Sequence, residues 1–122
     1  MPIVDVELVC ESEAEFRAIS AEALANALGV VLGSQSGNTW VRLRYLSSAC
    51  YAENLVAGSQ AELPVFVTVL LAHPPVESAL VEQVAALTKA VANGVGRSSE
   101  LVHVQYSPAA AGRQAFGGEL VQ

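Results

Sequence analysis

Two arginines separated by a single residue are the first candidates for chemistry in this sequence. Arg42 and Arg44 lie within residues 40–46, a segment that we predict to be a β-strand. Alternate residues of a strand point to the same face, so the two guanidinium groups share one side of the sheet. Paired guanidinium groups suit a carboxylate, which they can hold by bidentate hydrogen bonds. The spacing therefore indicates a carboxylate-binding face.

A purely structural interpretation of the same arginines has equal weight. Asp5 and Glu7 have the same spacing on a strand that we expect to lie beside residues 40–46. Four charges laddered across a sheet would satisfy one another without any ligand. Both interpretations hold together if one arginine is structural and the other binds a ligand.

The sequence lacks the motifs of other common catalytic and binding sites. There is no zinc-ligand spacing, no phosphate-cradling glycine loop, no Ser-x-x-Lys and no recognisable pair of acidic residues. Cys10 and Cys50 fit neither a metal site nor a redox Cys-x-x-Cys motif, so we expect free thiols used in packing. We expect neither a metal nor a cofactor.

Composition limits the class of protein. The chain has 122 residues, which we interpret as a single domain over residues 1–122, and 52% are hydrophobic, enough to build a core. Its net charge of -6 argues against binding nucleic acid or an anionic membrane surface. The longest apolar run, residues 64–72, is too short to span a bilayer, and the N-terminus lacks the features of a secretory signal. We therefore expect a cytoplasmic protein.

The first half of the chain predicts strand, helix and strand. Residues 2–9 alternate between apolar and polar positions, which is typical of a strand with one buried face. The stretch from Ser12 to Glu15 matches a capping box, and apolar residues continue at helical spacing to Leu28, with Gly29 as the expected stop. Turn residues 33–38 precede the strand at 40–46.

The second half repeats this order. Residues 63–69 mirror residues 1–7 at an offset of 62, and residues 101–106 mirror residues 40–45 at an offset of 61. Between them, a helix is predicted from about Val76 to Gly94 or Gly96. The two offsets agree within one residue, so we infer an internal β-α-β duplication with units of about 1–60 and 63–122.

Two such units predict an α+β fold with a four-stranded mixed sheet and both helices on one face. Each β-α-β unit contributes two parallel strands and the helix between them. The opposite face of the sheet is then left uncovered, with a mixed set of side chains that oligomerisation would bury. That set is Ile3, Asp5, Glu7, Trp40, Arg42 and Arg44.

Three features together resemble the tautomerase superfamily. They are the N-terminal Met-Pro-Ile-Val, the duplicated β-α-β unit and the C-terminal stretch from Gly112 to Leu120, which contains Gly-Gly-Glu-Leu. This superfamily includes 4-oxalocrotonate tautomerase, macrophage migration inhibitory factor and malonate semialdehyde decarboxylase. The chain looks like the fused, two-unit kind. The resemblance implies a homotrimer whose sheets form a barrel-like interior and whose C-terminal hairpins reach across to neighbours.

The resemblance also implies a catalytic role for Pro2. Removal of Met1 would expose a secondary amine at the base of a pocket, whereas retention of Met1 leaves an amide without basicity. Burial disfavours the charged form of an amine and lowers its pKa toward neutrality, which suits a general base. A proline that stays protonated would instead serve as a general acid. The alternative is that Pro2 is only the first residue of an edge strand.

The resemblance assigns the remaining site residues by their position in the sequence. Arg42 aligns with an arginine that holds a substrate carboxylate in these enzymes, and His103 stands at the corresponding place of the second unit. The resemblance places Tyr106, Arg113 and Phe116 in the wall of the pocket, with trimer packing as the alternative for Phe116. A second arginine of the short tautomerases falls at Ser12, so its absence puts diacid substrates in doubt.

The leading functional hypothesis is a cofactor-independent tautomerase or isomerase for a small keto or enol carboxylic acid. Pro2 would shuttle the proton, and Arg42, with or without Arg44, would hold the carboxylate. The first alternative is a decarboxylase or hydratase of a three-carbon acid that uses a cationic Pro2 and both arginines. The second is a trimeric binding protein without catalysis, which a blocked Pro2 and an Arg42–Asp5 ion pair would favour.

Overall fold

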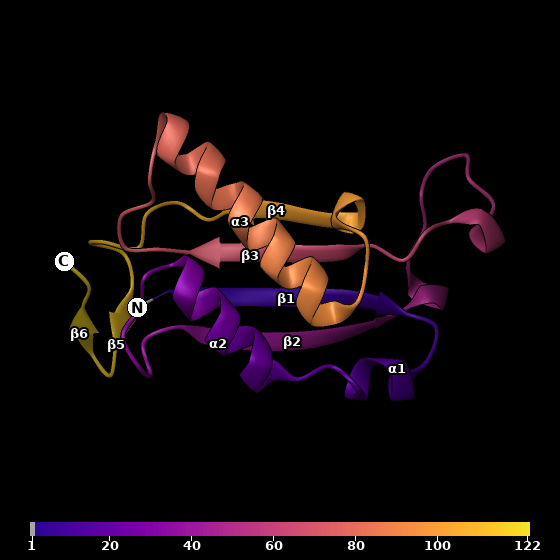
Figure 1. Cartoon of the computed structure of the whole chain (residues 1–122), viewed down its shortest axis with the longest axis horizontal. Helices are drawn as coiled ribbons and strands as arrows, with labels where there is room; N and C mark the ends of the chain where they lie inside the picture. The colour runs from indigo at the N-terminus through magenta and orange to yellow at the C-terminus, as the bar shows by residue number, and fades with distance from the viewer. Residues whose placement is uncertain (1) are drawn as a thin grey trace.

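Four strands form one mixed sheet in the computed structural model, which describes residues 2–122. The strands are β1 (Ile3–Cys10), β2 (Trp40–Ser47), β3 (Val65–Leu70) and β4 (Val102–Tyr106). Their order is β2-β1-β3-β4, with β1 parallel to β2, β3 parallel to β4 and β1 antiparallel to β3 (Figure 1). Each parallel pair belongs to one repeat unit, so the predicted mixed sheet is confirmed.

The helices cover a single face of this sheet. They are α1 (Glu13–Arg17), α2 (Ala21–Val31) and α3 (Glu77–Val95), and α2 and α3 pack beside each other (Figure 1). Three short 3-10 turns occupy Ser48–Cys50, Gly58–Gln60 and Ser99–Leu101. Within residues 2–122, none of the helices has the length and apolar character needed to cross a lipid bilayer.

The single helix predicted for the first unit is in fact two helices. Ser12 caps α1 by accepting a hydrogen bond from the Glu15 amide at 3.2 Å, as the capping box predicts. Ser20 then caps α2 by accepting from the Ala23 amide at 3.0 Å. A serine hydroxyl that bonds to nearby amides favours a new helix start over continuation of the old helix. The predicted stop at Gly29 is also wrong, because α2 continues to Val31.

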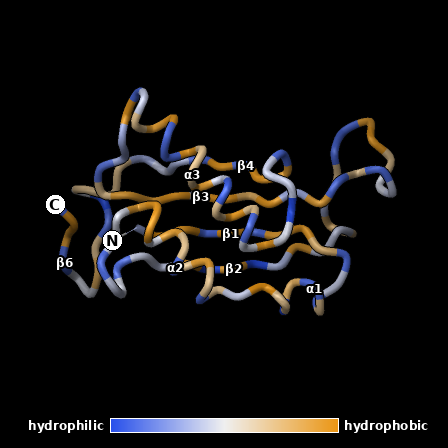
Figure 2. Tube along the Cα trace, in the orientation of Figure 1, coloured by the Kyte–Doolittle hydropathy of each residue, from blue (hydrophilic) through white to orange (hydrophobic). Residues whose placement is uncertain are grey.

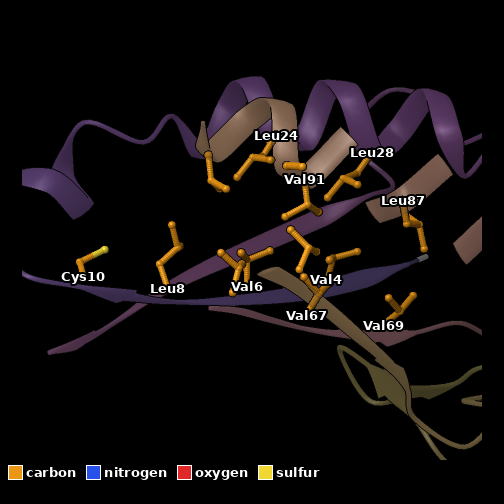
Figure 3. Close-up of a cluster of buried hydrophobic side chains, with 14 of the residues drawn as sticks. Val4, Val6, Leu8, Cys10, Leu24, Leu28, Val67, Val69, Leu87 and Val91 are labelled. Carbon is orange, nitrogen blue, oxygen red and sulfur yellow. The ribbon is translucent and has the colours of Figure 1, made fainter. Parts of the chain in front are cut away.

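The hydrophobic core lies between the sheet and the two long helices. Alternate residues of β1 and β3 point toward the helices and are almost fully excluded from solvent, and α2 and α3 add leucine and valine side chains (Figure 3). Figure 2 shows β3 as a mostly hydrophobic strand. The central members are Val4, Val6, Leu8, Val65, Val67, Val69, Leu24, Leu28, Leu87 and Val91. The strands β1 and β3 are therefore fixed in register by burial on one face.

The opposite face of the sheet carries no helix and is arranged in rows across the strands. The register places Trp40, Ile3 and Leu70 in the first row. The second row holds Arg42, Asp5, Thr68 and Gln105, and the third holds Arg44, Glu7, Phe66 and His103. Trp40 and Phe66 are 47% and 37% exposed. We call these three rows the open face.

One arginine joins the two repeat units. Arg97, just after α3, donates to the carbonyl oxygen of Leu63 at 2.9 Å and to Glu15 at 3.1 Å. The same guanidinium donates to the Cys10 sulfur at 3.2 Å. Cys10 is buried, as expected of a packing residue. Cys50 is exposed, because it lies in the 3-10 turn that follows the end of β2. Both are free thiols.

The chain ends in a small hairpin made of β5 (Ala115–Phe116) and β6 (Glu119–Leu120). The ring of Phe116 meets the indole of Trp40 edge to face, with 5.0 Å between ring centroids. The hairpin therefore lies at the end of the sheet where β1 begins, beside the N-terminus (Figure 1).

Candidate active site

Pro2 is buried at the head of β1 and faces the helix side of the sheet. Its carbonyl oxygen accepts a hydrogen bond from the Trp40 amide at 2.9 Å, which fixes it beside the start of β2. It borders a surface cavity of about 360 Å³. The other lining residues are Leu32, Leu71, Ala72, His73, Pro75 and Gln83. The fold therefore places Pro2 beside a surface cavity.

Tyr106 reaches this pocket through a second residue. Its hydroxyl donates to Oε1 of Gln83 at 2.6 Å, and Gln83 lines the cavity beside Pro2. Burial raises the pKa of the Tyr106 phenol above its ordinary value, so the hydroxyl keeps its proton at neutral pH. Sequence reasoning missed Gln83, because it is a polar residue of a helix that was recognised by its apolar stripe.

Arg42 is occupied by a partner within the chain. Its Nε and Nη2 donate to the two carboxylate oxygens of Asp5 at 2.5 and 2.8 Å. The hydrogen bond to Asp5 raises the pKa of Arg42, and the attraction between the two charges adds a smaller increase. Arg44 lies opposite Glu7 in the register, yet within residues 2–122 it forms no ion pair. Of the two predicted pairs, Arg42 with Asp5 and Arg44 with Glu7, the structure therefore forms the first and not the second.

His103 borders a second cavity, on the open face. This cavity measures about 400 Å³ and is lined by Phe66, Thr68 and Gln105 as well. The His103 ring lies 5.7 Å from the Phe66 ring. His103 shares the third row with Arg44, but the two stand on opposite edge strands of the sheet.

The last two predicted site residues lie at the C-terminal end of the chain. Arg113 is exposed in the turn before the hairpin, and Phe116 packs on Trp40. Within one chain, the predicted residues thus form three groups. Pro2 lines the first cavity and Tyr106 is joined to it through Gln83, Arg42, Arg44 and His103 share the open face, and Arg113 and Phe116 belong to the hairpin region. No group of three or more potential metal-ligating side chains occurs in the described part of the chain.

Comparison with known proteins shows a likeness of structure and not of sequence. No protein-family model and no curated protein matches the sequence. Solved structures match over almost the whole chain. A fused 4-OT, a symmetric trimer, is 18% identical, with a TM-score of 0.72 over 97% of this chain and 94% of that one.

Two further solved structures extend this likeness. The macrophage migration inhibitory factor of Oncomelania hupensis is 19% identical, with a TM-score of 0.72 over 100% of this chain and 83% of that one. A malonate semialdehyde decarboxylase inhibited by 3-bromopropiolate is 22% identical, with a TM-score of 0.65 over 94% of this chain and 90% of that one. The sheet order, the paired helices and these neighbours together show that the chain has the fold of the tautomerase superfamily.

Proposed function

We propose that this protein is a cofactor-independent tautomerase acting on a small keto or enol carboxylic acid, with Pro2 as the general base after removal of Met1. The observation that carries this proposal is the burial of Pro2 beside a surface cavity whose lining includes Leu32, Leu71, Ala72 and Pro75. No Asp, Glu, Lys or Arg is among the residues that line this cavity. An amine there would have a lowered pKa and accept a proton near neutral pH.

The reaction follows from the position of that amine. Pro2 nitrogen takes a proton from the carbon next to the substrate carbonyl, and the electron pair of the broken C–H bond moves onto the carbonyl oxygen. The protonated proline then gives the proton either to that oxygen, which forms the enol, or to another carbon of the conjugated system as the electron pair returns from the oxygen. Enol-to-keto conversion is the first of these routes run in reverse. The net result is isomerisation without loss of atoms or electrons, so the chemistry needs no cofactor.

Arg44 is the better candidate for holding the substrate carboxylate. Arg42 already uses its Nε and Nη2 on Asp5, whereas Arg44 forms no ion pair within residues 2–122. Arg44 lies on the open face, and Pro2 borders a cavity on the helix side. We therefore propose a homotrimer in which the open face of one subunit meets the Pro2 pocket of the next. The fused 4-OT trimer supports such an assembly.

The test begins with the intact mass of untagged protein, which reports whether Met1 has been removed. Processed protein is then assayed for enol-to-keto conversion with a series of small enol acids. Pro2→Ala is expected to lower kcat/KM by at least about 100-fold, the usual contribution of a positioned base. Pro64→Ala is the matched control, because Pro64 occupies the mirrored position of the second unit and has no free amine. Full activity of Pro2→Ala would overturn the proposal.

The pH profile separates this reaction from decarboxylation or hydration on the same scaffold. A base must be unprotonated, so activity should fall as pH drops through the Pro2 pKa. An acid must be protonated, so loss of activity as pH rises would indicate the decarboxylase or hydratase.

A trimeric binding protein without catalysis is the second candidate, and one observation favours it. The bidentate Arg42–Asp5 pair satisfies the arginine that the family resemblance assigns to the substrate. Retention of Met1 in protein from the native host, together with inactivity toward every enol acid, would establish this alternative.

A further inference from the structure

We propose that Gln83, held in place by the hydroxyl of Tyr106, donates a hydrogen bond from its Nε2 to the carbonyl oxygen of the substrate at Pro2. This proposal rests on the proposed function and adds to it the group that stabilises the developing enolate. Gln83 would be a catalytic residue, and Tyr106 a positioning residue that acts through it.

The cavity offers few polar side chains for this role. Besides Pro2 it is lined by the apolar side chains of Leu32, Leu71, Ala72 and Pro75, and only Gln83 and His73 carry polar groups. The Nε2 of His73 lies 3.1 Å from the backbone oxygen of Gln122, which occupies that nitrogen. Gln83 is thus the cavity side chain best able to meet a substrate oxygen.

The amide of Gln83 is oriented by its neighbour. Its Oε1 accepts from the Tyr106 hydroxyl at 2.6 Å, while its Nε2 has no hydrogen-bond partner within residues 2–122. A side-chain amide has one acceptor group and one donor group, so satisfying the oxygen leaves two N–H donors free. Rotation of the amide by half a turn would replace this hydrogen bond with one from Nε2 to the hydroxyl oxygen, so the orientation in the structure, in which Oε1 accepts, is the one that leaves the N–H donors free.

Tyr106 is suited to hold this orientation across the working pH range. The phenol is partly buried between β4 and α3, and this burial raises its pKa above the ordinary value. The hydroxyl therefore remains a donor at every pH at which a prolyl amine titrates near neutrality.

A donor at this position would act on the transition state. When Pro2 removes the proton from carbon, negative charge develops on the carbonyl oxygen. A preorganised N–H stabilises that oxyanion more than it stabilises the neutral carbonyl, so the effect falls on kcat. No Asp, Glu, Lys or Arg is among the residues that line this cavity, and the amide would supply this stabilisation as a neutral donor.

The Tyr106–Gln83 hydrogen bond also ties β4 to α3, and a purely structural role would show only in stability. Kinetics of matched variants separate the two roles. Gln83→Met keeps the volume and helical propensity of the side chain but has no N–H, and Gln83→Glu replaces the donor with an acceptor. Gln60→Leu, in the exposed 3-10 turn Gly58–Gln60, is the control.

Each variant is assayed with the best enol acid found for the wild type, and its thermal unfolding is recorded. Gln83→Met and Gln83→Glu are each expected to lower kcat by about 100-fold, the usual effect of losing one oxyanion donor, with KM changed less than about threefold. Tyr106→Phe is expected to lower kcat by about tenfold. Adding Tyr106→Phe to Gln83→Met should cause no further loss, because both changes remove one interaction.

Either of two results would overturn the inference: kcat of Gln83→Met within threefold of the wild type, or full additivity of the two changes. Failure of the proposed function is distinguishable from these, because it would appear as undiminished activity of Pro2→Ala or as inactivity of the wild type. Loss of activity in Pro2→Ala with retention in both Gln83 variants would overturn only the role of Gln83.

Discussion

At the scale of single residues, pairing within the chain separates side chains that look equivalent in the sequence. Arg42 and Arg44 have the same type, spacing and face, and each stands opposite an acidic residue of β1. Only Arg42 forms its ion pair, a bidentate contact with Asp5. A guanidinium without a partner can bind a carboxylate without first breaking an existing hydrogen bond, and Arg44 is in that state within residues 2–122.

Replacement of Arg44 therefore tests how the substrate carboxylate is held. Arg44→Ala is expected to raise KM for an enol acid by roughly 10- to 100-fold and to leave kcat nearly unchanged, since a charge-assisted hydrogen bond to the carboxylate acts before and during the reaction alike. Arg17→Ala is the control, because Arg17 lies exposed on α1 and pairs with Glu13. Steady-state kinetics would contradict the assignment if Arg42→Ala raised KM more than Arg44→Ala.

At the scale of elements, the close approach of α2 and α3 depends on a glycine. Gly94 lies inside α3, and a Cβ placed on it would overlap Cδ2 of Leu24 on α2. Leu24 is fully buried, so it has little room to move. The sequence indicates Gly94 or Gly96 as the helix end, and the helix continues to Val95 and stops at Gly96, whose φ of 68° is left-handed.

Gly94→Ala is expected to destabilise the protein although alanine favours helices. Overpacking against Leu24 costs about 1–3 kcal/mol, which exceeds the gain in helix propensity of about 1 kcal/mol. Gly29→Ala is the matched case, because a Cβ there meets only ordinary contacts with Thr39 at 3.9 Å, and it is expected to stabilise by about 0.5–1 kcal/mol. Urea unfolding of both variants checks the pair, and equal shifts of the same sign would refute the argument.

At the scale of the whole molecule, one face of the sheet has no helix over it within residues 2–122. The helices bury the side chains of one face, while Trp40 and Phe66 remain exposed on the open face. Arg97 and the β1–β3 pairing already join the two units, so the chain needs no partner to connect them. Contact with further copies of the chain is the interaction that we propose for the open face.

The assembly can be tested by light scattering. The wild type is expected to have three times the mass of one chain, and Phe66→Asp is expected to shift the mass toward that of a monomer by placing a charge in the buried interface. Val30→Asp is the control, because Val30 is 83% exposed on α2, away from the open face. A monomeric wild type, or a control that dissociates like Phe66→Asp, would contradict the proposed trimer.

Much of the fold follows from local pattern and repetition. Period-two alternation indicates the buried face of β1, the mirrored segments at offsets of 62 and 61 predict two equivalent units, and both predictions are confirmed by the sheet. The break between α1 and α2 was not predicted, because the apolar spacing continues across it and the Ser20 cap competes with that pattern locally.

The sequence by itself determined the four strands of the sheet, their duplication and the face of the sheet on which Arg42, Arg44 and His103 lie, because side-chain periodicity depends only on the backbone. The tertiary structure alone decided that Arg42 and not Arg44 forms its expected ion pair, and that Tyr106 meets Gln83 beside the Pro2 cavity. Tyr106 and Gln83 are 23 positions apart in the sequence, and Arg42 and Asp5 are 37 positions apart. The Tyr106–Gln83 contact depends on how α3 packs on the sheet, and the Arg42–Asp5 contact depends on side-chain geometry across β1 and β2. No local spacing in the sequence specifies either of them.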